Sequence, residues 1–384
     1  MMLVALRMIM GDRMKFLGLL IGLTFAAMLI TQQAAIFLGY TTRTWAFIDD
    51  TPHPDLWVMD PQVRFTEDPK PVTDASLYRV RGTPGVAWAT PMYRSGLLVQ
   101  TDDGTQELCT VVGVDDATLM GAPRTMVDGR TEDLRQSDGV IVDETAANNE
   151  LRVSDGAGGT RPLRVGDTLS INDHAARVVG ICRNTTPFYW TPVIYTTYSR
   201  ALAFAPGQRK LMTYVLVGLA PGAEAGLVSE DIAARTGLKA YTKSGFARLT
   251  AEYTLVKTGI LINFGITIAL GVLIGLLVCG QTFFNYVVDN ARLFAALKAL
   301  GLSNAGVLRM VCVQVLAVGV LGYGLGVGLA SLSGTLLGKV GLSFHLPWQL
   351  LVGSFAAVMG ICLATACLSS LRVLRLEPGV VFKG

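Results

Sequence analysis

The sequence predicts a membrane protein in which one transmembrane helix precedes a large extracytoplasmic α+β domain and three more transmembrane helices follow it. Hydrophobic residues make up 51% of the 384 residues and charged residues only 16%, whereas soluble domains carry about 25% charge. Four stretches are apolar over the roughly 20 residues that a helix needs to cross a bilayer. A segment of about 215 residues, long enough for its own core, separates the first stretch from the second.

The four predicted spans are residues 16–39, residues 259–284, the stretch between Arg309 and Lys339, and residues 350–371. The first is longer than the apolar core of a signal peptide, and no A-x-A site follows it, so we expect an uncleaved anchor. Residues 2–14 alternate apolar and basic side chains, which is typical of a short helix at the membrane interface.

The distribution of Lys and Arg around the spans predicts the orientation. Basic residues gather before the first span, between the second and third, and after the fourth: Arg7, Arg13, Lys15; Arg292, Lys298, Arg309; Arg372, Arg375, Lys383. The turn between the third and fourth spans has only Lys339. We therefore expect a multi-pass protein of the cell membrane with both termini in the cytoplasm and the large domain outside.

Between the first two spans the pattern changes to short β-like runs broken by turn residues. The predicted strands are residues 55–60, 96–100, 109–114, 139–143, 169–171, 176–182 and 214–218, and the predicted helices are 143–151 and 223–236. Asn172 and Asp173 would form the turn of a strand pair, and residues 154–159 a flexible loop tip. This mixture predicts an α+β domain.

Cys109 and Cys182 are the only cysteines outside the predicted spans. In an oxidising compartment they could form a disulfide, although a buried free thiol suits a strand equally well. Both alternatives stay open. The other four, Cys279, Cys312, Cys362 and Cys367, fall within spans as packing residues.

Motifs for catalysis or metal binding are missing from the chain. There is no H-E-x-x-H, C-x-x-C or G-x-S-x-G. His53, His174 and His345 lie far apart, and the acid pairs 102–103 and 115–116 stand beside turns, where solvated Asp is common. The net charge of +3 is too small to indicate nucleic acid. We therefore expect neither an enzyme nor a metal site.

Residues 334–339, GTLLGK, look like part of a phosphate loop. A true loop needs G-x-x-x-x-G-K-[ST] between a strand and a helix. Here Ser333 replaces the first Gly, Val340 replaces the final Ser or Thr, and the segment ends a membrane span. We expect no nucleotide site in this chain.

The predicted spans contain no charged residue at mid-membrane, which argues against a carrier that moves a polar solute through its own core. Small residues recur four positions apart instead: Gly18 and Gly22, Gly271 and Gly275, Gly322 and Gly326, Gly324 and Gly328. This spacing lets helix backbones approach closely. It fits packing inside one chain or the seam of a dimer.

Residues 289–301 between the second and third spans predict a short amphipathic helix. Its apolar face carries Leu293, Phe294, Leu297 and Leu300, with Arg292 and Lys298 off that face. Gly301 is suited to cap the C-terminus. A helix with an apolar face in the cytosol needs a membrane surface or a protein partner.

Several stretches resemble the MacB/FtsX-type, or mechanotransmission, permeases of ABC transporters, and among these the DevC-like permeases. Residues 295–301, AALKALG, look like the coupling-helix motif ATLKAxG. Residues 371–382, LRVLRLEPGVVF, are similar to the closing motif LDPAxVF, and residues 163–169 with 178–181 resemble the outer-domain strands L-x-V-G-D and V-V-G-I. The one-plus-three layout of spans is shared. The family usually begins the coupling motif with Glu, where this chain has Leu293 and Phe294, so no ion pair is carried over.

The resemblance implies three parts: residues 1–40 (interfacial helix and first span), 41–258 (a domain like the MacB periplasmic core) and 259–384 (FtsX-like spans, a coupling helix at about 289–301, and the tail). The implied ATPase-coupling residues are Arg292, Phe294, Leu297, Lys298, Leu300 and Gly301, and the implied tail contacts are Arg372, Arg375, Glu377 and Pro378. Gly18, Gly22, Gly271 and Gly275 are the predicted helix-packing or dimer residues.

The resemblance also implies the partners and the cargo. They are a separate ABC ATPase that binds ATP and Mg²⁺, a second copy of the chain, membrane lipids and, in cells with an outer membrane, a periplasmic adaptor and an outer-membrane channel. The cargo would be lipid-like or otherwise amphiphilic and handled outside.

Two other functions compete with the exporter permease. One is an FtsX-like regulator that passes ATPase motion to an extracellular enzyme and transports nothing, although outer domains of that kind are smaller than residues 41–258. The other is a membrane-anchored enzyme, which the missing catalytic motifs disfavour. Loss of export with unchanged wall-hydrolase activity separates the first from the exporter, and activity of the outer domain alone would support the second.

Overall fold

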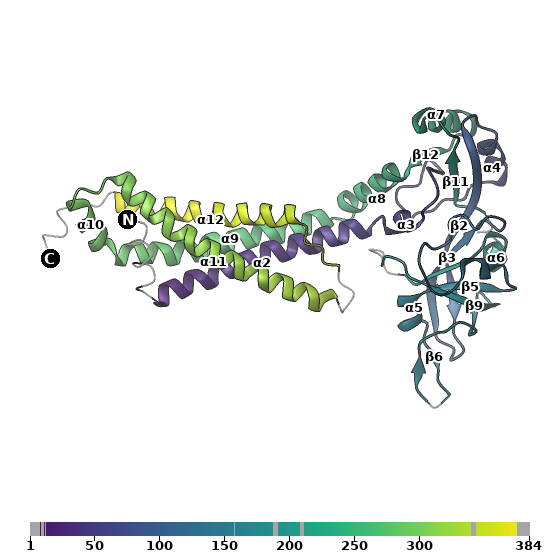
Figure 1. Cartoon of the computed structure of the whole chain (residues 1–384), viewed down its shortest axis with the longest axis horizontal. Coiled ribbons are helices and arrows are strands. Elements are labelled where there is room, and N and C mark those ends of the chain that lie inside the picture. Colours follow the sequence, from purple (N-terminus) through teal and green to yellow (C-terminus); the bar gives the residue numbers. More distant parts are fainter. Residues whose placement is uncertain are drawn as a thin grey trace. The chain divides into compact units, whose positions relative to one another are not determined.

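The computed structural model describes residues 13–156, 158–186, 191–207, 211–338 and 343–374, together with Met8 and Gly11. The chain divides into two compact units (Figure 1). One, the helical unit, comprises Met1–Tyr40 and Gly259–Gly384, and the other, the α/β domain, is Thr41–Thr258.

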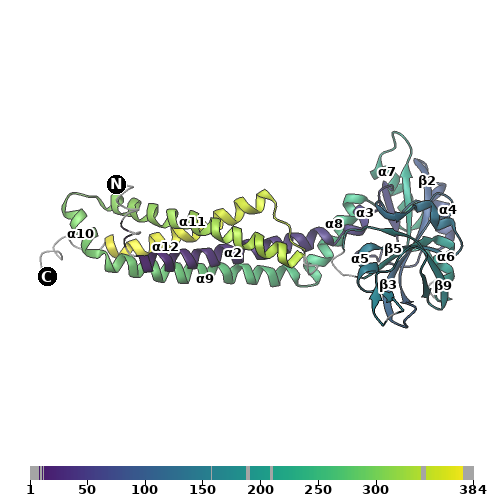
Figure 2. The same cartoon turned by 60° about the horizontal axis from the view of Figure 1, so that its bottom comes forward.

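Four long helices build the helical unit: α2 (Arg13–Arg43), α9 (Ile260–Asp289), α11 (Asn304–Gly338) and α12 (Trp348–Leu374). They lie side by side in both views (Figures 1 and 2). Each is long and apolar enough to cross a membrane. This confirms the predicted layout of one span, an inserted domain and three further spans.

Close contact between these helices depends on glycine. A Cβ on Gly22 would lie 2.7 Å from Val278 of α9, and a Cβ on Gly275 would lie 3.0 Å from Ala26 of α2. Gly18 and Gly271 face the same helix pair at 3.6 and 3.4 Å. The four predicted packing glycines therefore lie in contacts inside one chain, between α2 and α9.

Two polar side chains make hydrogen bonds between helices of the helical unit. The Gln314 side chain donates a 3.2 Å hydrogen bond to the Tyr286 hydroxyl, and both residues are fully buried. The Tyr323 hydroxyl donates to the Leu351 carbonyl at 2.6 Å. Polar groups inside a bilayer cannot bond to water. These two bonds therefore favour the arrangement in which the bonded faces of α9, α11 and α12 meet.

The α/β domain is built on a mixed sheet whose main path runs β12-β1-β11-β2-β3-β10-β5-β9-β4, with β8 beside β2 and β9. The strands are β1 (Leu56–Met59), β2 (Val86–Gln100), β3 (Gln106–Val114), β4 (Met126–Gly129), β5 (Gly139–Asp143), β8 (Thr168–Ile171), β9 (His174–Cys182), β10 (Val193–Thr197), β11 (Tyr214–Leu219) and β12 (Lys239–Thr242). A separate hairpin pairs β6 (Val153–Ser154) with β7 (Thr160–Arg161).

Strand β2 connects the two halves of this sheet. Its first half pairs with β11, from Val86 to Met92, and its second half pairs with β3, from Tyr93 to Gln100. The sequence predicted only residues 96–100 of this strand. The apolar alternation that marks a strand is interrupted at Pro91, Arg94 and Ser95. The sequence pattern therefore did not predict the first ten residues of β2.

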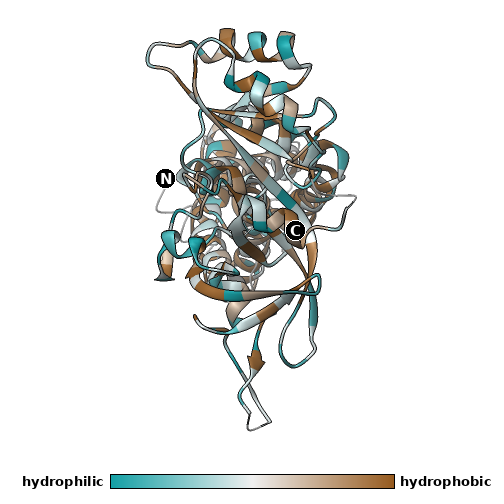
Figure 3. Ribbon diagram, turned by 90° about the vertical axis from the view of Figure 1, so that its right-hand side faces the viewer, coloured by the Kyte–Doolittle hydropathy of each residue, from teal (hydrophilic) through white to brown (hydrophobic). Residues whose placement is uncertain are grey.

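Helices cover the sheet: α3 (Ala46–Asp50), α4 (Asp74–Arg81), α5 (Glu144–Asn148), α6 (Tyr198–Phe204), α7 (Ala225–Thr236) and α8 (Lys243–Lys257), with the 3₁₀ turn η1 at Thr131–Arg135. Strand side chains alternate between faces. Accordingly, Leu56 and Val58 pack in one apolar cluster with residues of α4 and α7, while Trp57 and Met59 pack in another with residues of α3 and α8. Along the ribbon, hydrophilic and hydrophobic residues alternate repeatedly (Figure 3).

The hairpin β8–β9 has the turn that the sequence predicts. Asn172 and Asp173 both adopt left-handed backbone angles, with φ of 47° and 66°, as a two-residue turn between twisted strands requires. The two outer cysteines are buried free thiols. Cys109 and Cys182 lie in different apolar clusters, and burial raises the pKa of both thiols well above its ordinary value.

Candidate functional site

The helix α10 (Ala291–Ala299) is joined to α9 and to α11 by short connections. A single residue, Asn290, separates it from α9, and the Asn290 side chain donates to the Tyr286 carbonyl at 2.8 Å. At the other end four residues precede α11, and the Ser303 hydroxyl accepts from the Gly306 N–H at 3.2 Å. A side-chain cap on the first turn of α11 fixes where that helix begins.

The C-terminus of α10 ends as the sequence predicts. Gly301 has a φ of +98°, which glycine adopts without a Cβ clash. Its N–H donates to the Lys298 carbonyl, and the Leu302 N–H donates to the Leu297 carbonyl, both at 3.0 Å. This pair of bonds is a Schellman motif, and it turns the chain sharply from α10 toward α11.

The apolar residues of α10 divide between two faces. Phe294 is fully buried with Ala295 in the core of the helical unit, and Leu297 packs against that core. Leu293 and Leu300 are instead 52% and 84% exposed. Arg292 and Gly301 are also exposed, and Lys298 is partly exposed. The four apolar residues therefore do not form the one continuous face that the sequence predicts. Phe294 and Leu297 hold α10 against the core, and Leu293 and Leu300 are exposed.

An ion pair joins the beginning of α2 to the end of α9. The Lys15 ammonium lies 2.6 Å from the Asp289 carboxylate, and Asp289 is the last residue of α9, two positions before α10 begins. Phe16 and Leu19 of α2 pack in the same core as Phe294. The start of the first span is thus attached to the corner where α9 meets α10.

The predicted tail contacts lie mostly outside the described residues. The structure does not describe Arg375, Glu377 or Pro378. For Arg372 it describes only the backbone, within α12. Most of the predicted interfacial helix at residues 2–14 is likewise outside the described part.

The α/β domain holds a second set of contacts that sequence reasoning missed, around α3. Helix α3 begins three residues after α2 ends. The Asp50 carboxylate accepts from the Thr185 N–H at 2.7 Å and from the Thr185 hydroxyl at 3.1 Å. The Phe47 ring lies 4.6 Å from the Arg94 guanidinium carbon. These bonds fasten the segment that follows the first span to the sheet.

Arg94 is the central charge of this region and is only 4% exposed. It donates to the Thr66 carbonyl at 2.6 Å and to the Glu67 carboxylate at 2.7 Å. Burial alone would lower the pKa of the Arg94 guanidinium, but Glu67 and the neighbouring tyrosines raise it, with a net upward result. Burial raises the pKa of Asp50, and the Thr185 bonds offset only part of that rise. No sequence signal identified this group, because its partners are 27 to 135 residues apart.

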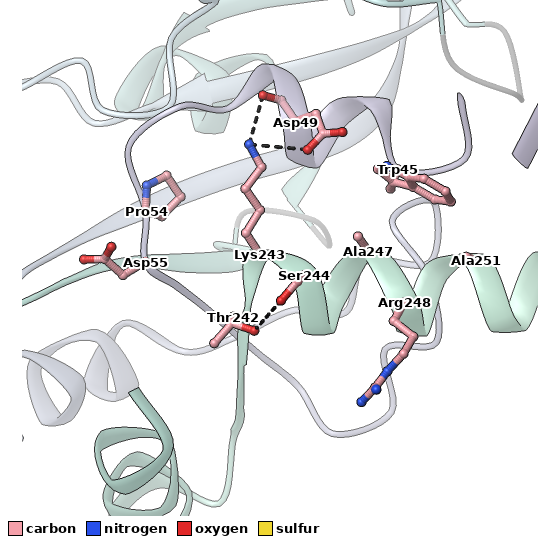
Figure 4. A pocket seen from close by; sticks show the side chains of 10 residues that line it. All are labelled: Trp45, Asp49, Pro54, Asp55, Thr242, Lys243, Ser244, Ala247, Arg248 and Ala251. Atoms are coloured by element: carbon pink, nitrogen blue, oxygen red, sulfur yellow. Dashed lines mark hydrogen bonds and ion pairs between the residues drawn. The ribbon is translucent and has the colours of Figure 1, made fainter. Parts of the chain in front are cut away.

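A groove of about 820 Å³ opens beside α3 (Figure 4). Its lining comes from the segment after α2 and from β12 and α8: Trp45, Asp49, Pro54, Asp55, Thr242, Lys243, Ser244, Ala247, Arg248 and Ala251. Lys243 extends from α8 toward α3, where its ammonium lies 3.4 Å from the Asp49 carboxylate.

The described residues hold no group of three or more His, Cys, Asp or Glu side chains placed to bind a metal ion. The segment that looks like a phosphate loop is helical in its described part, since α11 continues to Gly338. A Cβ on Gly334 would lie 2.5 Å from the Phe344 ring. This glycine serves helix packing and presents no cradle of backbone N–H groups.

Two family models together match most of the chain. A model described as the MacB-like periplasmic core domain matches residues 17–235, and one described as the FtsX-like permease C-terminal matches residues 265–378. The first match alone covers more than half of the chain.

Individual proteins are similar to this chain over part or most of its length. An uncharacterized ABC transporter permease of Mycobacterium tuberculosis is 25% identical over 324 residues, covering 82% of this chain and 80% of that protein. The macrolide export ATP-binding/permease protein MacB of Psychrobacter cryohalolentis is 23% identical, covering 73% of this chain and 43% of that protein. Among solved structures, the periplasmic region of MacB from Actinobacillus actinomycetemcomitans aligns with a TM-score of 0.37 at 13% identity, covering 50% of this chain and 90% of that one.

Proposed function

The chain belongs to the MacB/FtsX-type permeases of ABC transporters, and on that basis we propose that it converts the motion of a separate ATPase into movement of its α/β domain. In this proposal the exposed side of α10 docks on the ATPase in the cytoplasm. The partner binds ATP and Mg²⁺, and this chain hydrolyses nothing. Two copies of the chain and two ATPase subunits make up the working assembly.

The observation that supports this most strongly is the way α10 is held. Its buried side is anchored by Phe294, and its two ends join α9 and α11 through a single residue and a capped turn. A displacement of the exposed side of α10 should therefore move the adjoining ends of α9 and α11 as well, because no long flexible linker separates these helices. Leu293 and Leu300, with Arg292 nearby, offer an apolar and basic surface to a partner.

The path from that corner to the α/β domain is continuous along the chain. The Lys15–Asp289 ion pair attaches the beginning of α2 to the end of α9. α2 then continues as one helix to Arg43, and the segment after it is fastened to the sheet through Phe47 and Asp50. We propose that axial or tilting motion of α2 is passed to the α/β domain through these contacts.

The distribution of Lys and Arg supports an orientation with α10 in the cytoplasm and the α/β domain outside. We propose export of a lipid-like or otherwise amphiphilic cargo. The spans lack charged residues at mid-membrane, and the buried Gln314 and Tyr286 side chains bond to each other. A path for a polar solute through the bundle would need polar groups left free to face it.

A substitution on the exposed side of α10 tests the docking role. We expect Leu300→Asp to reduce stimulation of the partner ATPase, and its pull-down, by about tenfold or more, because a carboxylate would be desolvated in an apolar contact. Leu300 is 84% exposed, so the thermal unfolding midpoint of the full chain should not change. Both quantities are measured on the chain and its ATPase reconstituted in lipid nanodiscs.

Two variants complete this experiment. Leu98→Asp, an exposed leucine of the α/β domain, is the matched control and should leave stimulation unchanged. Lys298→Glu, a charge reversal on α10, should weaken the contact as well. Wild-type stimulation and pull-down by both α10 variants would rule out this helix as the docking surface.

A further inference from the structure

Residues 64–68, which we call the brace segment, lie between β1 and α4 and belong to neither a helix nor a strand. Hydrogen bonds give the segment a defined shape. The Asp68 N–H donates to the Phe65 carbonyl at 3.1 Å, which closes a turn. The Asp68 carboxylate accepts from the Arg64 guanidinium at 2.9 Å and from the Lys70 ammonium at 2.7 Å. A displacement of one side of this turn should therefore move its other side as well.

One side of the brace segment is bonded to the middle of the sheet. The buried Arg94 guanidinium of β2 donates to the Thr66 carbonyl and to the Glu67 carboxylate. The Tyr214 hydroxyl of β11 donates to the same Thr66 carbonyl at 3.1 Å. Arg94 lies just past the point where β2 changes partner, since Met92 pairs with β11 and Tyr93 with β3. The segment is thus attached to both halves of the sheet.

The other side of the brace segment contacts α8. The Phe65 and Tyr253 rings are stacked, with centroids 4.7 Å apart and planes 7° from parallel. The Arg64 guanidinium carbon lies 5.1 Å from the centroid of the same Tyr253 ring. Tyr253 is four residues from the end of α8 at Lys257, and α9 begins at Ile260. The brace segment therefore holds the part of α8 that is nearest to the second span along the chain.

The first half of α8 is held by different contacts. The Phe246 ring lies 5.7 Å from the Trp57 ring of β1 and 5.8 Å from the Tyr214 ring of β11. A helix packed at one end alone could swing about that end. The additional stack at Tyr253 opposes such a swing.

The same guanidinium also contacts α3. The Phe47 ring, on the segment that follows the first span, lies against Arg94. Arg94 therefore holds the connection from the first span directly and the connection to the second span through the brace segment. A buried cation is strongly destabilised when it loses a charged partner, so the guanidinium keeps these contacts together.

We propose that the brace segment and Arg94 make the sheet, α3 and the end of α8 move as one rigid body. Arg94, Phe65 and Tyr253 act here as positioning residues. That this rigid body receives ATPase-driven motion through both connections to the spans rests on the proposed function, whereas the rigid attachment itself does not.

Hydrogen exchange of the full chain in nanodiscs tests the attachment. In Phe65→Ala and in Tyr253→Ala, the amides of residues 251–257 should exchange about fivefold faster or more, because an aromatic stack is lost. Residues 244–249 should change by less than about twofold, since the packing of Phe246 remains. Peptide mass spectrometry measures both ranges.

Two further variants serve as controls for the exchange experiment. Tyr253→Phe keeps the ring and should exchange like the wild type. Tyr78→Ala removes an exposed tyrosine of α4 whose ring also lies beside an arginine, 5.9 Å from the Arg81 guanidinium carbon. It should leave residues 251–257 unchanged. The thermal unfolding midpoint of each variant checks that the fold is retained.

A distance measurement tests whether the brace segment transmits motion. Spin labels are placed at Leu108→Cys on β3 and Val256→Cys on α8, both exposed positions, in a Cys367→Ala background. The chain is reconstituted with its ATPase, with and without a non-hydrolysable ATP analogue, and read by double electron–electron resonance. With an intact brace segment, the distance distribution should be the same in both states. With Tyr253→Ala it should shift when the analogue binds, and adding Leu300→Asp should abolish that shift.

The outcomes separate the brace segment from the proposed function. Exchange at the wild-type rate in both alanine variants would refute the attachment, and a nucleotide-dependent distance with an intact brace segment would refute the rigid body. Faster exchange and normal ATPase stimulation, without a nucleotide-dependent shift in Tyr253→Ala, would refute transmission through the brace segment. Faster exchange together with ATPase stimulation that Leu300→Asp does not change would refute the proposed function alone.

Discussion

Asp167 shows how one side chain holds a loop of the α/β domain. Its carboxylate accepts two hydrogen bonds from the Arg161 guanidinium, at 2.7 and 2.8 Å, and one from the Arg164 N–H at 2.8 Å. The Arg161 pair, helped by the Arg164 N–H, holds the pKa of this carboxyl below its ordinary value. Asp167 belongs to the L-x-V-G-D stretch, so that motif has a structural role here.

The sign of this shift sets a pH dependence. A carboxyl with a lowered pKa stabilises the fold above its unfolded pKa, about 3.9, and this stabilisation is lost as the pH falls through the folded pKa. We expect Asp167→Asn to lower the thermal unfolding midpoint by about 2–4 °C at pH 7. The gap between wild type and variant should stay constant from pH 8 to pH 5 and close toward pH 3. A gap that widens on acidification would contradict this role.

Among the elements, the contact of α11 with α2 depends on which glycines face inward. A Cβ on Gly326 would lie 2.7 Å from both the Ala27 side chain and the Thr24 carbonyl of α2. Two positions earlier, a Cβ on Gly324 would meet nothing within 4 Å. Two glycines of the same helix thus have opposite roles, which the four-residue spacing in the sequence does not distinguish.

This contrast gives a matched pair of substitutions. Gly326→Ala should destabilise the helical unit by about 1–3 kcal/mol, because backbone and side chains of α2 must shift. Gly324→Ala should cost nothing or stabilise slightly, since alanine favours a helix. Unfolding of the full chain in mixed detergent micelles, followed by circular dichroism, measures both. Equal effects of the two substitutions would show that α11 and α2 do not meet at Gly326.

The sequence predicted the elements with the strongest periodic signal. Four uninterrupted apolar stretches, the Asn172-Asp173 turn and Gly301 each satisfy a local rule, and each agrees with the structure. Helix α8 was missed because its buried positions, Phe246, Thr250 and Thr254, are four apart but mostly polar.

Contacts distant in sequence could not be predicted in the same way. The α10 pattern indicated an amphipathic helix but not that Phe294 is buried while Leu300 is exposed, since both are apolar. The direction of each side chain depends on how α10 meets α9 and α11. Likewise, nothing local joins Asp50 to Thr185 or Phe47 to Arg94, and these contacts form only when the sheet does.

For the whole molecule, the proposed orientation separates two surfaces by the membrane. Leu300 of α10 and Leu108 of the α/β domain are both exposed leucines, so each can be replaced by cysteine with little cost. In a Cys367→Ala background, a membrane-impermeant maleimide applied to spheroplasts should label Leu108→Cys directly. It should label Leu300→Cys only after permeabilisation. Labelling of both without permeabilisation would contradict the orientation.

The central claim is that the exposed side of α10 receives the motion of a separate ATPase. The most direct measurement places a photoreactive benzoyl-phenylalanine at position 300 of the full chain in native membranes, with position 108 as the control, and identifies the adducts by mass spectrometry. We predict an adduct with an ABC-type ATPase at position 300, a yield that changes when ATP is bound, and none at position 108. An ATPase adduct at position 108 and none at position 300 would contradict the account.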